Sequence, residues 1–228
     1  MIPCRAFYLM RHGETEANAE NRATGNKETP LTAKGLAGAA DARRVVEALS
    51  VPPRKIFHSP LSRARITAEV VNANLRVPLQ VHPDLIEHAF GAWQGLPWPT
   101  VRAWLNEGRE PEGGETFQAL EERVVRAMTA ILADPEDPLL VVGHGGFARA
   151  LLRVCGRTLP IGAIRNTTLY ELTPPSAPEA SWDVGSYTLA PNGTLVREVV
   201  DGSEATLSPL QGTSSFGHKN GGGHDGSG

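Results

Sequence analysis

The chain has 228 residues, of which 40% are hydrophobic, and a formal net charge of −3. Such a length allows one large domain or two small ones with a sizeable apolar core. The small negative charge argues against a nucleic acid or an anionic membrane as partner, so any anion site has to be local. No stretch resembles a signal peptide or a membrane-spanning segment. Cys4 and Cys155 lie far apart, so we expect reduced thiols in a cytoplasmic protein.

Two short apolar stretches each lead into a histidine. Residues 6–10 are followed by Arg11 and His12, and residues 139–142 lead into His144. Both stretches read as buried strands, and parallel strands present ligand-facing residues at their carboxyl ends. Two strand ends that carry histidines, one with an added arginine, suit a doubly charged anion such as phosphate. A single histidine after a strand is more often an ordinary loop residue, but the repeated layout weakens that alternative.

The region between these strands begins with an expected helix and a second strand. Thr32 is placed to cap a helix that runs to about Leu49, with Leu36 on its inner side. A strand is predicted over residues 55–58. Residues 14–23, which precede this helix, are polar and indicate a loop or a short helix.

The next predicted helix carries a third candidate cation. Ser59 could cap about fifteen residues, with Pro60 at the first helical position. Ser59, Arg63 and Thr67 recur every four residues and therefore share one face. Helical arginines are usually solvated, but Arg65 fits that role better than Arg63.

Residues 80–115 differ from the rest of the chain. They hold three of the four tryptophans and several glycines and prolines, with one short helix expected at 99–106. Such a segment is typical of an excursion that covers a site, a cap or lid, although a packed loop would look similar.

The last part of the chain completes the expected fold. An amphipathic helix starts near Thr116 and stops before Asp134. The elements expected after it are a strand at 139–142, a helix at 147–154, a strand at 167–172 and edge strands within 181–200. The alternation predicts an α/β fold, a three-layer α/β/α sandwich with a mostly parallel central sheet, over residues 1–200. Residues 201–228 are Gly/Ser-rich and predicted to be disordered.

At this point five motifs together resemble one known family. They are RHGETEAN (11–18), GNKETPLT (25–32), SPLSRARITAE (59–69), LIEHAFGAWQG (85–95) and VVGHGG (141–146). RHG alone is weak, but the five in this order resemble the histidine phosphatase superfamily, in its phosphoglycerate-mutase-like branch, across roughly residues 5–172. Glu28-Thr29 departs from the Asp-Ser that many relatives carry.

The resemblance implies a role for each matching residue. His12 resembles the nucleophile and Glu87 the proton donor. The residues similar to the phosphate pocket are Arg11, Arg63, His144, Gly145 at the start of the following helix, and Asn18 as a further substrate contact. Apolar neighbours such as Ile86 or Phe90, and the charge of the phosphate, could keep Glu87 protonated.

These features predict a metal-independent phosphatase without cofactor. Imidazole is an effective nucleophile when unprotonated, and two guanidiniums can grip phosphate oxygens. The expected substrate is a small phosphorylated metabolite, with phosphoserine, ribazole phosphate and sugar phosphates all open, and a homodimer is compatible with the sequence.

Two alternatives remain. One is a phosphoglycerate mutase of the 2,3-bisphosphoglycerate-dependent type. Mutases of this family resemble one another in a longer basic insertion between Glu87 and His144, where this chain has only Arg102, Arg109, Arg123 and Arg126. The other alternative, a catalytically silent binding module, is disfavoured because His12 and Glu87 are both present.

Overall fold

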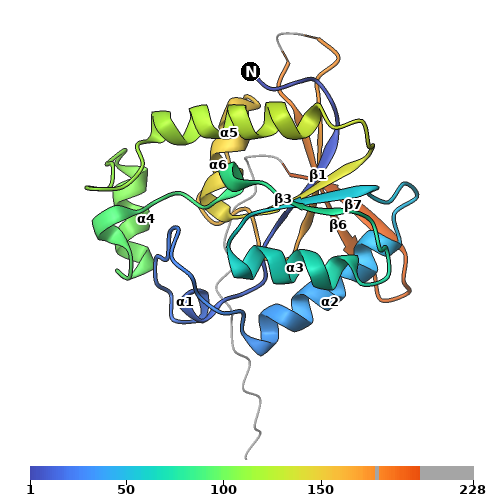
Figure 1. The fold of residues 1–228 in the computed structure, drawn as a ribbon, viewed down its shortest axis with the longest axis horizontal. Helices are drawn as coiled ribbons and strands as arrows, with labels where there is room; N and C mark the ends of the chain where they lie inside the picture. Colours follow the sequence, from blue (N-terminus) through green and yellow to red (C-terminus); the bar gives the residue numbers. More distant parts are fainter. Residues whose placement is uncertain (178–179, 201–228) are drawn as a thin grey trace, which may run out of the picture.

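The computed structural model describes residues 1–177 and 180–200 of the chain (Figure 1). The predicted disordered tail at 201–228 lies outside the described residues. The described strands are β1 Phe7–Arg11, β2 Lys55–His58, β3 Leu79–Val81, β4 Leu139–Gly143, β5 Leu169–Thr173, β6 Asp183–Leu189 and β7 Leu195–Val199. The helices are α1 Glu16–Ala19, α2 Ala33–Glu47, α3 Ser62–Asn72, α4 Trp98–Asn106, α5 Phe117–Leu132 and α6 Gly145–Val154, with single 3₁₀ turns η1 Pro83–Leu85 and η2 Gly91–Trp93.

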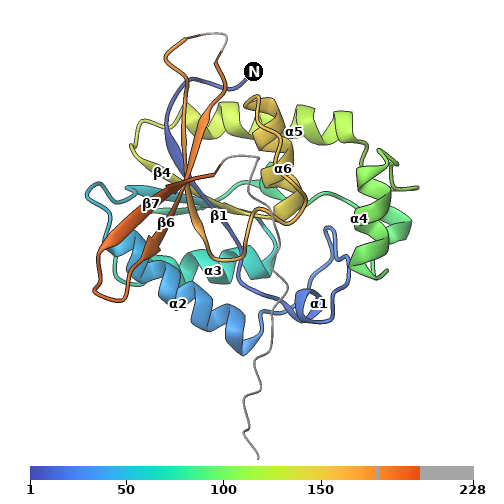
Figure 2. The same cartoon turned by 180° about the vertical axis from the view of Figure 1, so that it is seen from behind.

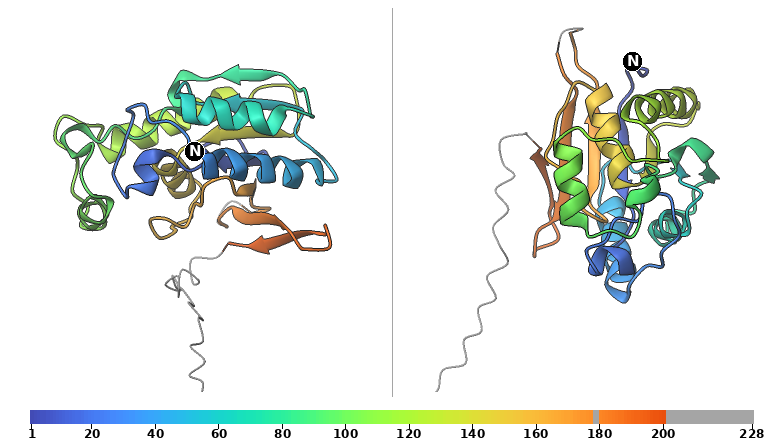
Figure 3. Two further views of the ribbon diagram at one scale, coloured as in Figure 1. Left: turned by 90° about the horizontal axis from the view of Figure 1, so that it is seen from below. Right: turned by 90° about the vertical axis from the view of Figure 1, so that its left-hand side faces the viewer.

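All seven strands form one sheet, in the order β3-β2-β4-β1-β5-β6-β7. The neighbours from β3 to β1 pair in parallel, whereas β5, β6 and β7 each pair antiparallel with the strand before them in that order. The β6–β7 hairpin therefore lies at one edge of the sheet (Figure 3). The parallel half gathers the carboxyl ends of β1, β2 and β4 at one side.

Helices cover both faces of the sheet, as Figures 1 and 2 show. Helices α5 and α6 pack on one face, where alternate residues of β1 and β4, such as Leu9 and Val141, join them in one core cluster. Helices α2 and α3 pack on the other, against Met10 and Val142. Because successive strand residues point to opposite faces, one apolar run supplies both cores. The predicted three-layer α/β fold is confirmed, with a central sheet that is mostly parallel in its core and antiparallel from β1 outward through β5, β6 and β7.

Two helices begin where the sequence analysis placed their starts, and Thr32 acts as the predicted cap. The Thr32 side chain accepts a hydrogen bond from Gly35 N at 3.0 Å, and the Thr116 side chain accepts one from Ala119 N at 3.1 Å. The expectation that Leu36 lies on the inner side of α2 is wrong, because its side chain is 43% exposed. Gly35 occupies that contact, since a Cβ there would meet the Glu14 carbonyl oxygen at 2.1 Å.

The predicted start of α3 is also wrong. The helix begins at Ser62, and Ser59 does not cap it. Instead, the Glu28 carboxylate caps this helix from a distant loop: it accepts from Ser62 N at 2.9 and 3.2 Å and from the Ser62 hydroxyl at 2.5 Å. Ser59 is thereby free to serve the site described below.

The short strand β3 was missed by the sequence analysis because it has only three residues, all exposed, at the sheet edge. The segment that follows it forms η1, η2 and α4. Its buried members Phe90, Trp93, Val101 and Leu105 cluster with Ala23 from the loop after α1. In the part of the chain that the structure describes, no helix is long and apolar enough to cross a membrane.

Candidate active site

His12 and His144 emerge next to each other at the carboxyl ends of two neighbouring strands. Strands β1 and β4 are parallel, with Arg11 opposite Gly143, so the next residue of each strand faces the same edge. The two imidazole centroids are 5.1 Å apart. Both side chains are almost fully buried. The register of one strand pair thus brings together the two predicted histidines.

Hydrogen bonds fix the tautomer of His12. Its Nδ1 lies 2.7 Å from the Gly13 carbonyl oxygen, which can only accept, so Nδ1 carries the proton. Its Nε2 accepts a hydrogen bond from Arg63 Nε at 3.2 Å and therefore presents a lone pair. Burial, together with the charges of Arg11 and Arg63, holds the pKa of His12 well below its usual value. Neutral, with Nε2 free of a proton, His12 has the form that a nucleophile needs.

Arg63 lies in the first turn of α3 and is only 2% exposed. Besides His12, it donates to the Lys27 carbonyl at 2.7 Å and to the Gly25 carbonyl at 2.8 Å. One turn later, the Thr67 hydroxyl donates to the Arg63 carbonyl and accepts from the amide that follows His12, at 2.7 and 3.0 Å. The predicted face is therefore buried against the loop after β1.

Arg11 is the second cation in the pocket. Its Nη1 donates to the Ile164 carbonyl at 3.0 Å, and its buried Nε has no hydrogen-bond partner within the described residues. The guanidinium lies against the start of α6, where a Cβ on Gly145 would be 3.4 Å from Arg11 Cζ and Nε, in ordinary van der Waals contact. An unpaired buried N–H is costly unless a ligand accepts from it.

His144 is held by Ser59. The Ser59 hydroxyl oxygen lies 2.7 Å from His144 Nε2 and accepts from Leu61 N at 3.3 Å. The hydroxyl can donate to His144 Nε2 while it accepts from Leu61 N, and in that arrangement the imidazole proton is on Nδ1. That Nδ1 is buried without a partner among the described residues. Burial and the neighbouring His12 and arginines hold the pKa of His144 well below its usual value.

Glu87 faces the start of α6. One carboxylate oxygen accepts from His88 N at 2.7 Å and Phe147 N at 3.0 Å, and the other accepts from Gly146 N at 3.0 Å. The expected apolar surroundings of this carboxylate are therefore wrong in detail. Its oxygens contact backbone N–H groups at a helix N-terminus, where the helix dipole also attracts negative charge.

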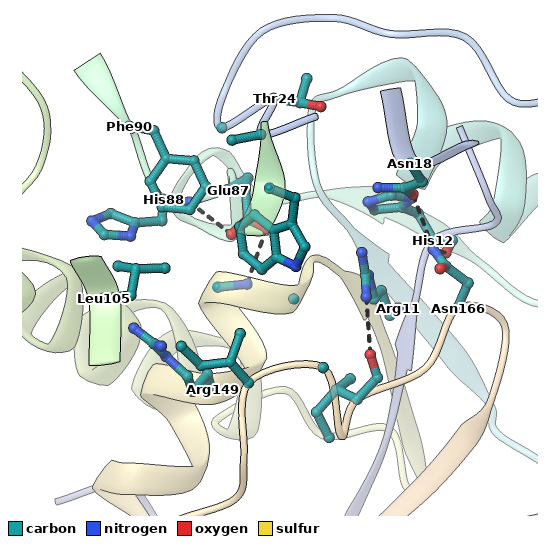
Figure 4. Close-up of a pocket in the computed structure, with 18 of the residues that line it drawn as sticks. Arg11, His12, Asn18, Thr24, Glu87, His88, Phe90, Leu105, Arg149 and Asn166 are labelled. Atoms are coloured by element: carbon teal, nitrogen blue, oxygen red, sulfur yellow. Dashed lines mark hydrogen bonds between the residues drawn. The ribbon is translucent and has the colours of Figure 1, made fainter. Parts of the chain in front are cut away.

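These side chains line one cavity of about 270 Å³ (Figure 4). Arg11, His12, Asn18, Arg63, Glu87 and Gly145 all contribute to its wall. His144, whose ring centroid lies 5.1 Å from that of His12, is not among the lining residues. The excursion supplies Phe90, Trp98 and Leu105 on the apolar side of the cavity.

Asn166 is a site residue that the sequence analysis missed. Its Nδ2 donates to the His12 carbonyl at 2.7 Å and reaches Asn18 Oδ1 at 3.4 Å. Asn18 in turn accepts from Thr15 N at 3.3 Å, in the cap of α1. The only available signal was an asparagine directly before the predicted strand at 167–172. Because β5 runs antiparallel to β1, its start lies at the site.

Arg149 and Arg22 also line the cavity without having been predicted. Arg22 donates to the Gly95 carbonyl at 3.0 Å and pairs with Glu20 at 3.2 Å. Within residues 1–177 and 180–200, no group of three or more His, Cys, Asp or Glu side chains is placed to hold a metal ion.

The model of the histidine phosphatase superfamily (branch 1) matches residues 7–177. The chain belongs to this superfamily. This histidine phosphatase is 32% identical over 157 residues to the adenosylcobalamin/alpha-ribazole phosphatase of Escherichia coli, a match that spans 64% of the chain and 76% of the relative. It is also 34% identical over 151 residues to a probable phosphoglycerate mutase, GpmB, of Salmonella choleraesuis, over 60% of the chain and 68% of the relative.

Among solved structures, the alpha-ribazole phosphatase from Shigella flexneri superposes with a TM-score of 0.63 at 24% identity, over 86% of this chain and 96% of that one. At this identity the likeness supports the fold alone. The matched family model and the phosphatase-named relative confirm two predictions: membership of the superfamily and a phosphoric monoester hydrolase activity.

Proposed function

We propose that this histidine phosphatase hydrolyses small phosphomonoesters in two steps, through a phosphohistidine on His12. The observation that carries the proposal is the state of His12: its Nδ1–H is bound to the Gly13 carbonyl and its Nε2 lone pair faces Arg63. A neutral imidazole in this orientation can attack phosphorus without first losing a proton.

In the first step, a bond forms between His12 Nε2 and phosphorus while the bond from phosphorus to the ester oxygen breaks. Arg63, Arg11 and the Nδ1–H of His144 donate to the equatorial oxygens, where negative charge accumulates. Among the described residues, four buried side-chain nitrogens lack a hydrogen-bond partner, and two of them, Arg11 Nε and His144 Nδ1, belong to this group of residues, as a site that accepts an anion requires.

Glu87, protonated beside the negative charge of the bound phosphate, gives its proton to the leaving oxygen and later takes one from the attacking water, which then cleaves the Nε2–phosphorus bond. The two steps together return the enzyme to its starting state. The charges that a metal would supply are carried by guanidiniums, so we propose metal-independent and cofactor-independent turnover.

Hydrolysis is favoured over mutase activity. Three of the four arginines between Glu87 and His144 are engaged away from the cavity, and the fourth, Arg102, is not among its lining residues. Arg123 pairs with Glu115 at 2.6 Å and Arg126 with Asp84 at 2.8 Å. Arg109 lies over the Trp104 ring, 4.6 Å from its centroid. No basic segment of that span is therefore directed at the cavity to hold a bisphosphorylated cofactor. The mutase-named relative keeps phosphoglycerate transfer as the alternative.

The natural substrate is a small phosphorylated metabolite rather than a nucleic acid, and a panel should include alpha-ribazole phosphate because of the relative's name. We further propose a cytoplasmic enzyme, supported by Cys4 and Cys155, which are both free thiols. The cap role of residues 80–115 is part of the same proposal, supported by the aromatic side chains that they contribute to the cavity.

Rapid quench with a ³²P-labelled phosphomonoester tests the covalent step. The expected label is acid-labile, stable to alkali and located on the peptide that contains His12. His12→Asn should lose both label and turnover, whereas the matched control His82→Asn should keep both, because His82 lies outside the cavity. Label on the His144 peptide, or inversion at a chiral phosphorus, would contradict the proposal.

A further inference from the structure

Arg149 is a cation in the cavity that the proposed phosphoryl chemistry does not use. It lies on α6, one turn after the phosphate-facing start of that helix. The other three arginines of the cavity wall, Arg11, Arg22 and Arg63, each donate to a backbone carbonyl. Within the described ranges 1–177 and 180–200, no hydrogen bond or ion pair of 4 Å or less involves Arg149.

The surroundings of Arg149 make this lack of a partner costly. Burial, and the neighbouring charge of Arg153, lower the pKa of Arg149, with Glu87 acting in the opposite direction. Its closest aromatic contact is Phe117, whose ring centroid lies 5.8 Å from the guanidinium carbon. A partly desolvated guanidinium without a counter-ion is destabilising unless a bound group supplies the negative charge. Perturbed charges of this kind in a cleft are typical of ligand sites.

Arg149 lies beyond the phosphate end of the cavity. In Figure 4, Arg149 and Leu105 occupy the side opposite His12, Asn18 and Asn166. The cavity wall also includes apolar side chains, which are Phe90, Trp98, Leu105, Leu152, Leu159 and Ile161. The cavity therefore combines a cationic phosphate end with apolar wall residues and with Arg149 on the side opposite His12.

We propose that Arg149 binds a second oxyanion of the substrate, so that this enzyme prefers phosphomonoesters whose apolar or aromatic body carries a carboxylate or a second phosphate. The inference rests on the proposed function and narrows its substrate class. Guanidinium offers parallel N–H donors that match either oxyanion, and the packed apolar wall strengthens that pairing by excluding water. A substrate whose body carries no second anionic group leaves Arg149 unpaired and does not form this interaction.

A matched pair of substrates tests the proposal. 4-Carboxyphenyl phosphate and 4-carbamoylphenyl phosphate have the same shape and differ in one charge. We expect the wild-type enzyme to favour the carboxylate in kcat/KM by about 10- to 100-fold, the effect of one charge-assisted hydrogen-bonded pair. 1,4-Phenylene bisphosphate carries a second phosphate in place of the carboxylate. Comparing its kcat/KM with that of the carboxylate substrate shows which oxyanion the enzyme prefers.

Variants locate the effect. Arg149→Met keeps the apolar stem and should abolish the preference, because it lowers kcat/KM for the carboxylate substrate much more than for the carbamoyl substrate. Arg149→Lys should retain part of it. The matched control is Arg153→Met, because Arg153 lies one turn along the same helix, pairs with Glu121 at 3.0 Å and does not line the cavity; its preference should equal that of the wild type.

Three results would overturn the inference: no preference in the wild type, a preference that survives in Arg149→Met, or an equal loss on both substrates in that variant. The last result would mean that Arg149 acts through Glu87 or the fold. Calorimetric binding of (4-carboxyphenyl)methylphosphonate and its carboxamide, which are not hydrolysed, repeats the comparison without turnover. If the carboxylate phosphonate binds more tightly than its carboxamide but none of the phosphomonoesters is hydrolysed, the role of Arg149 is supported and the proposed function is refuted.

Discussion

Replacing Gly146 by alanine tests whether the position of Glu87 controls leaving-group protonation. A Cβ at residue 146 would lie 2.6 Å from the nearer Glu87 carboxylate oxygen and 3.0 Å from His88 Cβ. Ordinary contact begins near 3.4 Å, so the carboxylate has to retreat by about 0.8 Å (3.4 − 2.6). That movement weakens its hydrogen bonds from Gly146 N and Phe147 N.

A misplacement of about 1 Å can cost about 10²-fold in rate. We therefore expect Gly146→Ala to lower kcat/KM about 10²-fold for alkyl phosphates. The loss should be only a few-fold for p-nitrophenyl phosphate, whose leaving group needs little protonation. Alanine in place of glycine stabilises a helix by about 0.5–1 kcal/mol. Loss of a hydrogen bond to a charged group destabilises the folded state by about 1.5–3 kcal/mol. The net destabilisation should be about 1 kcal/mol, or roughly 2–4 °C in Tm.

The assay is steady-state hydrolysis of both substrates beside a thermal melt. Gly143→Ala is the matched control, because its Cβ would meet only Phe147 Cδ1, at 3.9 Å. We expect that control to stay within threefold of the wild type on both substrates. An equal loss on alkyl and aryl phosphates in Gly146→Ala, or no loss on either, would refute the assignment of Glu87 as the acid.

Three further predictions follow from the contacts described above. First, because burial and two arginines lower the pKa of His12, the acid limb of kcat/KM should lie below pH 6.5, and NMR titration of His12 should show no protonation from pH 7.5 to about 6. Since the unfolded chain binds protons there that the folded chain does not, unfolding free energy should also fall as the pH drops below about 6.5, and less so in His12→Asn. Second, activity should survive excess EDTA, because arginines carry the positive charge; loss restored by a divalent ion would contradict this. Third, Glu28→Gln should cost about 1 kcal/mol in urea unfolding at pH 7, as loss of a helix cap does. Hydrogen bonds from Ser62 lower the pKa of Glu28 despite the opposing effect of burial, so this stabilisation is present above the unfolded pKa near 4.3 and disappears as the pH falls through the folded value. A cost that persists at pH 3 would mean that the carboxylate charge is not responsible.

Local patterns were sufficient for the predicted layers and for the two histidines. An apolar run that ends in a polar residue specifies a strand and its ligand-facing end within one stretch of about six residues. The register of β1 and β4, which pairs Arg11 with Gly143 and so sets His12 beside His144, came from the structure. The amphipathic period of α5 likewise follows from neighbours along the chain.

Only the tertiary structure decided which distant groups complete the site. Glu28 caps α3 across 34 positions, and Asn166 reaches the His12 carbonyl across 154. No periodicity encodes such contacts, because they depend on loop paths and on β5 running antiparallel to its neighbour. The lack of a partner for Arg149 was likewise visible only in the structure. From sequence alone, a helical arginine is expected to be solvated. Whether its charge is stabilised depends on the apolar and charged side chains that the fold places around it.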